Sequence, residues 1–327
     1  MADMLAAAQA VAQDVLFPRA METDGMDVLP AGNLDALAEG GLYGLTGPLE
    51  AGGAGADLET MAAVHETLGG ACLATSFVWA QHNFPVRVLA QGAPQRDEWL
   101  GPMCRGELRA GIALAGLMPG PPRLTARPDG DGWRLDGTAP WMTGWGLVHM
   151  VCVAARGPDN TVVLVMLDAV LQPGLTAVRQ RLVAADAAVT VQLGFDAVRA
   201  PADRVMGVIP YEEALYRGEF PLRMVGMIGL GVVSRCCSFI GPSRLDEELA
   251  TVRKQLLTMP PDGIFEARAA VGELAVRAAA ALVVSAGSGA ILVGSHPERL
   301  AREAVWVLAF GSRPAIKEGL LRRLGLS

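Results

Sequence analysis

The feature that most constrains this chain is the order in which its hydrophobic pattern changes. Residues 1–107 carry apolar side chains at helical spacing, residues 108–207 carry short alternating and β-branched runs, and residues 208–327 return to helical spacing. In AVTVQLGF (188–195), for example, every second residue is apolar. Because strands and helices do not alternate along the chain, a doubly wound sheet is excluded as the first interpretation. We predict an α+β multidomain protein with an N-terminal helical domain, a middle antiparallel β-barrel or sandwich and a C-terminal four-helix bundle.

Local signals mark the borders of the predicted elements. Asp57 is a suitable N-cap for a helix that begins at residue 58. RPDGDG (127–132) and RGPDN (156–160) predict turns between strands. Pro221 fits the first position of a long apolar helix that Gly241-Pro242 ends, and the last helix is expected to run from Pro297 to about residue 324.

Composition excludes several classes of function. The chain is 51% hydrophobic, has a formal charge of −7 and contains no dense Lys/Arg block, so neither a nucleic acid nor an anionic membrane is an expected partner. The apolar stretches 224–234 and 278–295 are better explained as buried helices than as membrane spans. The N-terminus carries Asp3 and lacks a basic region, so no signal peptide is predicted and a cytoplasmic location is expected.

The cysteines and histidines do not form a metal motif. Five cysteines occur without CxxC spacing, which is typical of reduced core thiols. The four histidines are widely scattered. We therefore expect no metal site.

TAPWMTGWG (138–146) is the most unusual stretch, because it holds two of the six tryptophans in a chain with 5% aromatic residues. Trp141 to Gly146 are predicted to lie against a flat organic cofactor, with Gly144 and Gly146 allowing a close backbone approach. The alternative is that the tryptophans cap the end of a strand in a β domain.

Five motifs in order resemble the acyl-CoA dehydrogenase superfamily of FAD flavoproteins. They are GGLYGLTGPLEAGG (40–53), VHETLGGACLATSFVWAQH (64–82), GELRAGIAL (106–114), GDGWRLDGTAPWMTGWG (130–146) and HPERLAREA (296–304). The resemblance runs over nearly the whole chain. It implies FAD as the cofactor, with Trp141, Met142, Thr143 and Gly144 along the isoalloxazine ring and the backbone of Leu114, Ala115 and Gly116 beside it.

Three further contacts are implied by the same resemblance. Arg253 matches an arginine that reaches the FAD pyrophosphate, although a solvated arginine explains it equally well. Gly287, Ser288 and Gly289 match a glycine-rich backbone that approaches the FAD of a neighbouring subunit, and a helix-packing role is the alternative. Ser312 matches a threonine near the cofactor.

The departures from the family pattern concern the reaction itself. The flavin strand lacks the family's Thr-Glu-Pro and Gly-Ser-Asp, since ALAGLMPGPP (113–122) stands there. Phe310 and Leu222 occupy the two positions where the family places its catalytic glutamate, and neither side chain takes a proton. The substitute candidates for the base are His82, at a helix end that is expected to face the cofactor pocket, and Glu219, just upstream of Arg223.

We therefore expect an FAD-dependent oxidoreductase that acts on an acyl thioester of coenzyme A or a carrier protein, as a homodimer or homotetramer. Two alternatives remain open at this stage. One is a flavin oxidase or monooxygenase on the same scaffold, which does not need the glutamate. The other is a non-catalytic subunit that pairs with an active paralogue.

Overall fold

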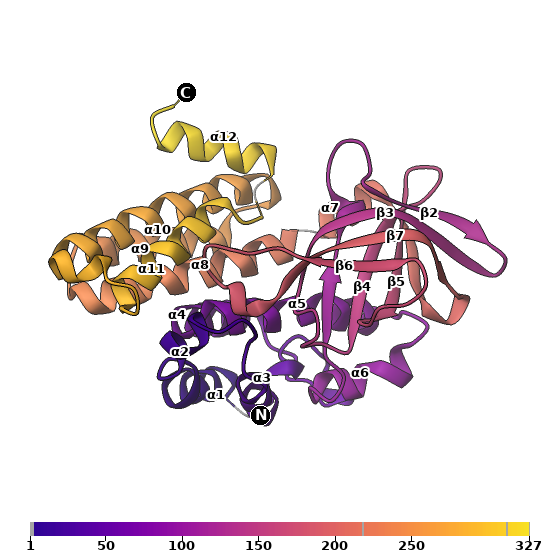
Figure 1. The fold of residues 1–327 in the computed structure, drawn as a ribbon, viewed down its shortest axis with the longest axis horizontal. Helices are drawn as coiled ribbons and strands as arrows, with labels where there is room; N and C mark the ends of the chain where they lie inside the picture. The colour runs from indigo at the N-terminus through magenta and orange to yellow at the C-terminus, as the bar shows by residue number, and fades with distance from the viewer. Residues whose placement is uncertain (1–2, 218, 312, 327) are drawn as a thin grey trace.

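The computed structural model describes residues 3–217, 219–311 and 313–326, and at residues 216, 217 and 219 it describes the backbone alone. Figure 1 shows three parts: helices from the N-terminal third below, a twisted sheet to the right and a C-terminal group of helices to the left. The predicted order of helices, strands and helices is confirmed.

The N-terminal part is helical, and α5 leads from it into the centre of the molecule. Its helices are α1 (Met4–Val11), α2 (Ala20–Asp24), α3 (Ala31–Glu39), α4 (Leu58–Ala71), α5 (Leu73–Ala90) and α6 (Arg96–Cys104). Asp57 caps α4 as predicted, because its carboxylate accepts a 2.8 Å hydrogen bond from the Thr60 amide. Cys72 alone separates α4 from α5, and its extended backbone turns the chain toward the sheet.

The middle part is one sheet with mixed strand directions. Its strands are β1 (Ala110–Ala113), β2 (Leu124–Asp129), β3 (Gly132–Thr143), β4 (Met150–Arg156), β5 (Thr161–Asp168), β6 (Leu175–Arg179), β7 (Thr190–Ala200) and β8 (Val205–Pro210). Their order is β6-β7-β3-β2-β4-β5-β8, with β1 paired to β4. Most neighbours are antiparallel as predicted, but β1 and β2 both run parallel to β4. The two predicted turns join β2 to β3 and β4 to β5.

The C-terminal part packs its helices side by side. They are α7 (Tyr211–Arg217), α8 (Glu219–Ile240), α9 (Arg244–Thr258), α10 (Ile264–Ala286), α11 (His296–Ala309) and α12 (Pro314–Arg323), and a short helical turn, η8 (Gly287–Ile291), follows α10. Pro221 is the third residue of α8 and not its first. The last predicted helix is in fact two, because Phe310 adopts extended backbone and Gly311 has φ 67° before Pro314 restarts the helix.

Two of these helices, α8 and α10, are long and apolar enough to resemble membrane spans. In the most apolar window of α8, 67% of the residues are buried inside the molecule, against 33% for α10. Packing within the bundle therefore accounts for the composition of α8. Much of α10 remains on the surface.

Candidate active site

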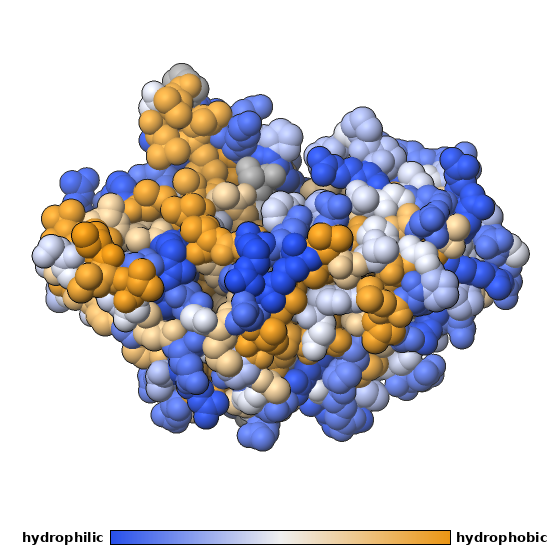
Figure 2. Space-filling model, viewed as in Figure 1, coloured by the Kyte–Doolittle hydropathy of each residue, from blue (hydrophilic) through white to orange (hydrophobic). Residues whose placement is uncertain are grey.

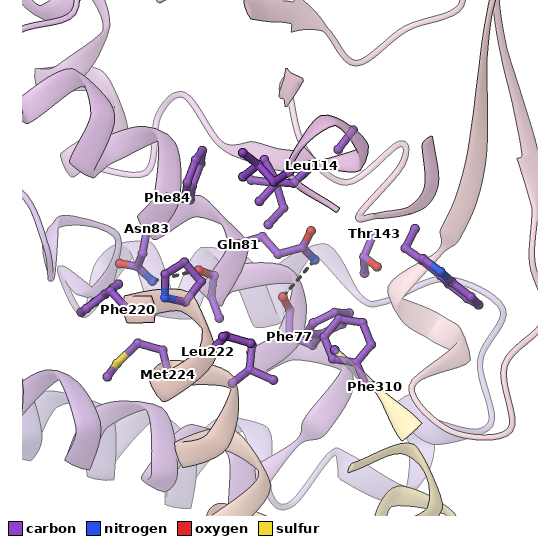
Figure 3. A pocket seen from close by; sticks show the side chains of 18 of the residues that line it. Phe77, Gln81, Asn83, Phe84, Leu114, Thr143, Phe220, Leu222, Met224 and Phe310 are labelled. Carbon is purple, nitrogen blue, oxygen red and sulfur yellow. Dashed lines mark hydrogen bonds between the residues drawn. The ribbon is translucent and has the colours of Figure 1, made fainter. Parts of the chain in front are cut away.

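A cavity of about 940 Å³ lies where the three parts of the chain meet. Its wall is built by α5, the turn after β1, the end of β3, the start of β7, the start of α8 and the end of α11. Sites for small molecules are usually concave spaces of this size between elements. Figure 3 shows side chains from these elements pointing toward a shared space.

One face of α5 forms the longest wall of the cavity. Phe77, Gln81, Phe84 and Arg87 all line it, because side chains three or four residues apart lie on the same side of a helix. Gln81 donates its side-chain amide to the Phe77 carbonyl at 3.2 Å, which fixes its direction in Figure 3. The wall is mainly apolar at the Phe77 end and ends in a cation at Arg87.

The end of β3 divides the tryptophan stretch between two faces of the sheet. Trp141 and Thr143 line the cavity, whereas Met142 is fully buried and its methyl group packs beside Gly111. This split follows from the two-residue period of a strand. Trp141 is 57% exposed at the rim, and the Thr143 hydroxyl lies 2.9 Å from the Thr190 hydroxyl of β7. The cavity thus presents an indole face beside two hydroxyl groups.

The turn after β1 forms the opposite wall. Leu114 and Ala115 line the cavity, but Gly116 does not. Gly116 packs against the backbone of Ala155, and its carbonyl accepts two hydrogen bonds from Arg156 at 3.0 and 3.1 Å. Gly144 likewise lies away from the cavity, with φ 91° and the Val78 side chain beside it. Met142, Gly116 and Gly144 therefore support the wall from behind.

Phe310 and Leu222 both line the cavity, so the positions expected to hold a base are occupied by apolar side chains. The Phe310 ring stacks on Trp306 with 4.4 Å between ring centroids and meets Phe77 edge-on at 4.4 Å. Such stacked and edge-on contacts are each worth about 1 kcal/mol beyond burial. The aromatic side chains hold this end of the cavity in a fixed shape.

Among the described residues, every charged side chain that lines the cavity is positive. Arg87, Arg223 and Arg313 line it, and no described Asp or Glu side chain does. His65 also lines it: Nδ1 donates to the Met61 carbonyl at 2.7 Å, and Nε2 has no hydrogen-bond partner among the described residues. Burial lowers the pKa of His65 to about 4, so the ring is neutral near pH 7 and offers Nε2 as an acceptor.

His82 does not face the cavity, which corrects the direction that we predicted for it. Its Nε2 donates to the Met103 carbonyl at 3.1 Å, and its Nδ1 accepts the Ala110 amide at 3.1 Å. Burial lowers the pKa of His82 to about 3. Both ring nitrogens join α6 to β1, so this histidine has a structural role. Glu219 is the first residue of α8, and its side chain lies outside the described residues.

The remaining predicted contacts lie away from the cavity or outside the described residues. Arg253 forms two hydrogen bonds with Glu66, at 2.6 and 2.7 Å, beside a separate hollow of about 440 Å³. Gly287, Ser288 and Gly289 are exposed in η8 at one end of the C-terminal bundle. Ser312 lies outside the described residues.

Three comparisons with known proteins find similarity to acyl-CoA dehydrogenases. A model of the acyl-CoA dehydrogenase N-terminal domain matches residues 2–107. Short-chain specific acyl-CoA dehydrogenase from Bos taurus mitochondria is 30% identical over 207 residues, covering 60% of this chain and 50% of the relative. The 3-sulfinopropanoyl-CoA desulfinase of Paraburkholderia xenovorans is 30% identical over 166 residues, covering 47% of this chain and 41% of the relative.

The fold agrees over the full length of the chain. A glutaryl-CoA dehydrogenase from Mycobacterium smegmatis, solved in complex with FADH2, superposes with a TM-score of 0.82 at 19% identity, covering 98% of this chain and 93% of that one. By sequence, the chain matches about half the length of the short-chain enzyme. Residues 2–107 are therefore similar to the N-terminal domain of acyl-CoA dehydrogenases, and the whole chain is similar in fold to a solved acyl-CoA dehydrogenase.

Several cavity residues were not predicted from the sequence. Thr190 alternates with apolar residues in its strand, but its pairing with Thr143 depends on the β3–β7 register. Arg87 and Arg313 carry no motif. The recurrence of Phe77, Gln81, Phe84 and Arg87 at helical spacing was the one available signal for this face of α5.

Proposed function

We propose that the protein is an FAD-dependent oxidoreductase acting on an acyl thioester. The observation that supports this most is the cavity itself: an exposed Trp141 face, the Thr143 and Thr190 hydroxyls and the Leu114–Ala115 wall surround one space of about 940 Å³. A tricyclic ring needs a flat apolar partner and a few hydrogen-bonding groups at its edge. The residues present meet that requirement.

In this proposal Trp141 would hold the isoalloxazine ring, and the Thr143 and Thr190 hydroxyls would bond its polar edge. When bound, the flavin supplies the chemistry of the redox step by accepting a hydride from the substrate. The apolar face of α5, Leu222 and the Phe310 ring exclude water from the acyl group and orient it. Of the residues predicted to touch FAD, Met142, Gly116 and Gly144 contribute by holding the backbone in place. Arg253 is already paired with Glu66, so we do not assign it to the pyrophosphate.

The base for a dehydrogenation is proposed to be Glu219, because it directly precedes Phe220, Pro221 and Leu222, which all line the cavity.

A second candidate function is oxygen-using flavin chemistry, as in an oxidase or monooxygenase. It is favoured by the apolar Phe310 and Leu222, since such a reaction needs no carboxylate at those positions. A non-catalytic subunit of an active paralogue is the third possibility that the experiment must address.

The test combines flavin binding with anaerobic reduction. Purified protein reconstituted with FAD is mixed with butyryl-CoA without oxygen, and the flavin absorbance is followed. Loss of that absorbance, with Glu219→Gln slowing it by at least a hundredfold, supports the dehydrogenase. Reduction only by a nicotinamide-dependent reductase identifies oxygen chemistry. Failure to bind FAD at all rejects both enzymes and leaves the partner subunit.

Trp141→Ala measures the proposed ring contact directly. We expect FAD affinity to fall about tenfold, because an aromatic stacking partner is lost, whereas Trp141→Phe keeps most of it. Trp133→Ala removes an indole from the same strand outside the cavity and serves as the matched control. Equal FAD affinity in Trp141→Ala and the wild type contradicts the contact.

We also propose a homodimer or homotetramer. Exposed apolar side chains gather at one end of the C-terminal bundle, at Val284, Ile291, Leu292 and Val293, with exposed fractions from 66% to 92%. Figure 2 shows apolar residues at that end of the molecule, to the left. Gly287, Ser288 and Gly289 belong to the same surface, so a neighbouring subunit that covers it brings this backbone to the interface.

A further inference from the structure

Aromatic side chains are concentrated in the wall of the cavity. Six of the chain's phenylalanines and tryptophans, which number 8 and 6, line it: Phe77, Phe84, Trp141, Phe220, Trp306 and Phe310. The buried core of the protein, by contrast, consists mainly of Ala, Val and Leu side chains. Aliphatic side chains exclude water equally well, so the rings in the cavity wall indicate ligands with flat apolar parts. The proposed isoalloxazine contact with Trp141 accounts for only one of these rings.

Three of the six rings form one corner of the cavity. The centroids of Trp306 and Phe310 are 4.4 Å apart and the ring planes differ by 6°, so these two rings are stacked. The Phe77 centroid lies 4.7 Å from Trp306 and 4.4 Å from Phe310, at interplanar angles of 73° and 79°. Because the three distances are nearly equal, the centroids form a triangle. Phe77 therefore lies beside the stacked pair and does not cover the outer face of Phe310.

One face of the Phe310 ring is thus left without an aromatic partner. Trp306 covers the other face, and no further ring contact of Phe310 occurs among the described residues. Phe310 lines the cavity, and Figure 3 shows it next to Phe77, below Gln81 and Thr143. One more flat ring inside the cavity can continue this stack, whereas an alkyl chain there forgoes the face contact.

The surroundings hold Phe310 in a fixed position. Its amide donates to the Trp306 carbonyl at 2.8 Å, and its carbonyl accepts a hydrogen bond from Arg268 at 3.3 Å. Arg268 and Trp306 are both buried, with exposed fractions of 2% and 6%. A ring that is already immobile loses little conformational entropy when a ligand stacks on it. The corner is therefore preorganised for a flat group.

We propose that the acyl group of the substrate carries an aromatic ring that stacks on the free face of Phe310. The substrate class is then an arylalkanoyl thioester. This inference rests on the proposed thioester function and names the substrate class of the same site. A stacked pair of rings strengthens binding about fivefold beyond the contribution of the buried area.

The experiment measures dissociation constants by calorimetry on the FAD-reconstituted protein for two ligands. S-(3-phenylpropyl)-CoA and S-(3-cyclohexylpropyl)-CoA differ only in whether the six-membered ring is aromatic. Both are thioethers, so they lack the carbonyl group that dehydrogenation requires and report binding alone. Each variant is judged by the ratio of its two dissociation constants, because the ratio cancels changes that affect both ligands alike.

Phe310→Leu removes the free aromatic face but keeps an apolar side chain. We expect it to weaken the phenyl ligand about fivefold relative to the cyclohexyl ligand, whereas Phe310→Tyr keeps the wild-type ratio. Phe239→Leu is the matched control, since Phe239 also makes ring contacts but lies outside the cavity. If Phe310→Leu loses both ligands, Phe310→Met gives the same comparison with a side chain that adapts to irregular space.

The outcomes separate the inference from the function on which it rests. An unchanged ratio in Phe310→Leu overturns the inference, as does failure of the wild type to bind the phenyl ligand. If the ratio shifts as expected but neither 3-phenylpropanoyl-CoA nor butyryl-CoA reduces the flavin, the inference stands and the proposed dehydrogenase is rejected. If butyryl-CoA reduces the flavin while the ratio is unchanged, the dehydrogenase stands and the aromatic substrate class is rejected.

Discussion

Single buried side chains show how much the surroundings decide the role of a residue. His65 and His82 are both fully buried and neutral, yet His82 bonds through both ring nitrogens, whereas Nε2 of His65 has no hydrogen-bond partner among the described residues. Arg299 and Glu303 form a buried ion pair at 2.6 Å within α11, in the motif that resembled the family's last helix. Such a pair is weak evidence for stability, but loss of one member leaves an isolated buried charge.

The two buried histidines predict an acid-sensitive fold. Their pKa values, about 4 for His65 and about 3 for His82, lie below the value of about 6.5 in an unfolded chain. The unfolded state therefore takes up more protons as the pH falls below 6.5. The stability that both groups contribute is complete above that pH and is lost progressively toward pH 4 and below.

We expect the free energy of unfolding to fall by about 2 kcal/mol between pH 6.5 and 5.5 from these two groups. Urea denaturation at pH 7.5, 6.5 and 5.5 measures it, in a range where most carboxylates stay ionised. His82→Gln and His65→Phe should each remove about half of the pH dependence, whatever they do to stability at pH 7.5. The same pH dependence in both variants as in the wild type would show that other groups cause it.

At the scale of elements, the contact between α4 and α8 depends on three glycines. Gly69 and Gly70 of α4 face Ile228 and Gly231 of α8, with backbone against backbone. A Cβ atom at Gly231 would lie 2.3 Å from the Glu66 carbonyl oxygen and 2.4 Å from the Gly70 nitrogen. Arg235 adds a 2.8 Å hydrogen bond to the Gly70 carbonyl. Because α8 also supplies Leu222 to the cavity, this crossing sets the position of one cavity wall.

Gly231→Ala should destabilise the protein by more than about 3 kcal/mol, because the helices must separate to accept the methyl group. The free energy of unfolding in urea measures the change. Gly207→Ala on β8 is the matched control, since nothing lies within 4 Å of a Cβ atom there, and its effect should stay within about 0.5 kcal/mol. Similar stability of the two variants would contradict the close crossing.

The contrast between these glycines and Asp57 shows what the sequence predicts and what it does not. The Asp57 cap, the two hairpin turns and the break at Gly241 are local, so neighbouring residues determine them. The contacts around the cavity are not local, because Thr143 meets Thr190 only through strand register. The pair of Arg253 and Glu66, outside the cavity, likewise joins residues 187 positions apart.

The direction of His82 was predicted wrongly for the same reason, since its partners Met103 and Ala110 belong to other elements. The resemblance located Trp141 and Phe310 because a motif records tertiary contacts that local pattern does not.

At the scale of the whole molecule, the apolar residues are unevenly distributed. The core runs without interruption from the N-terminal helices through one face of the sheet into the C-terminal bundle. The far end of the bundle nevertheless keeps Val284, Ile291, Leu292 and Val293 in solvent. Single exposed apolar residues are ordinary, but a contiguous group on adjoining turns of one surface is typical of an interface.

The proposed assembly follows from that surface and gives the last prediction. Light scattering after size exclusion should find a dimer or tetramer of the 327-residue chain at micromolar concentration. Ile291→Asp combined with Val293→Asp should dissociate it, because two charges would have to be buried at the interface. Both side chains are more than 70% exposed within one subunit, so the folded chain should tolerate the change, with unaltered circular dichroism.

Val178→Asp, at a 62% exposed position on β6, is the matched control and should leave the assembly intact. A wild-type monomer, or an assembly that survives the double substitution, would assign this apolar end to another role.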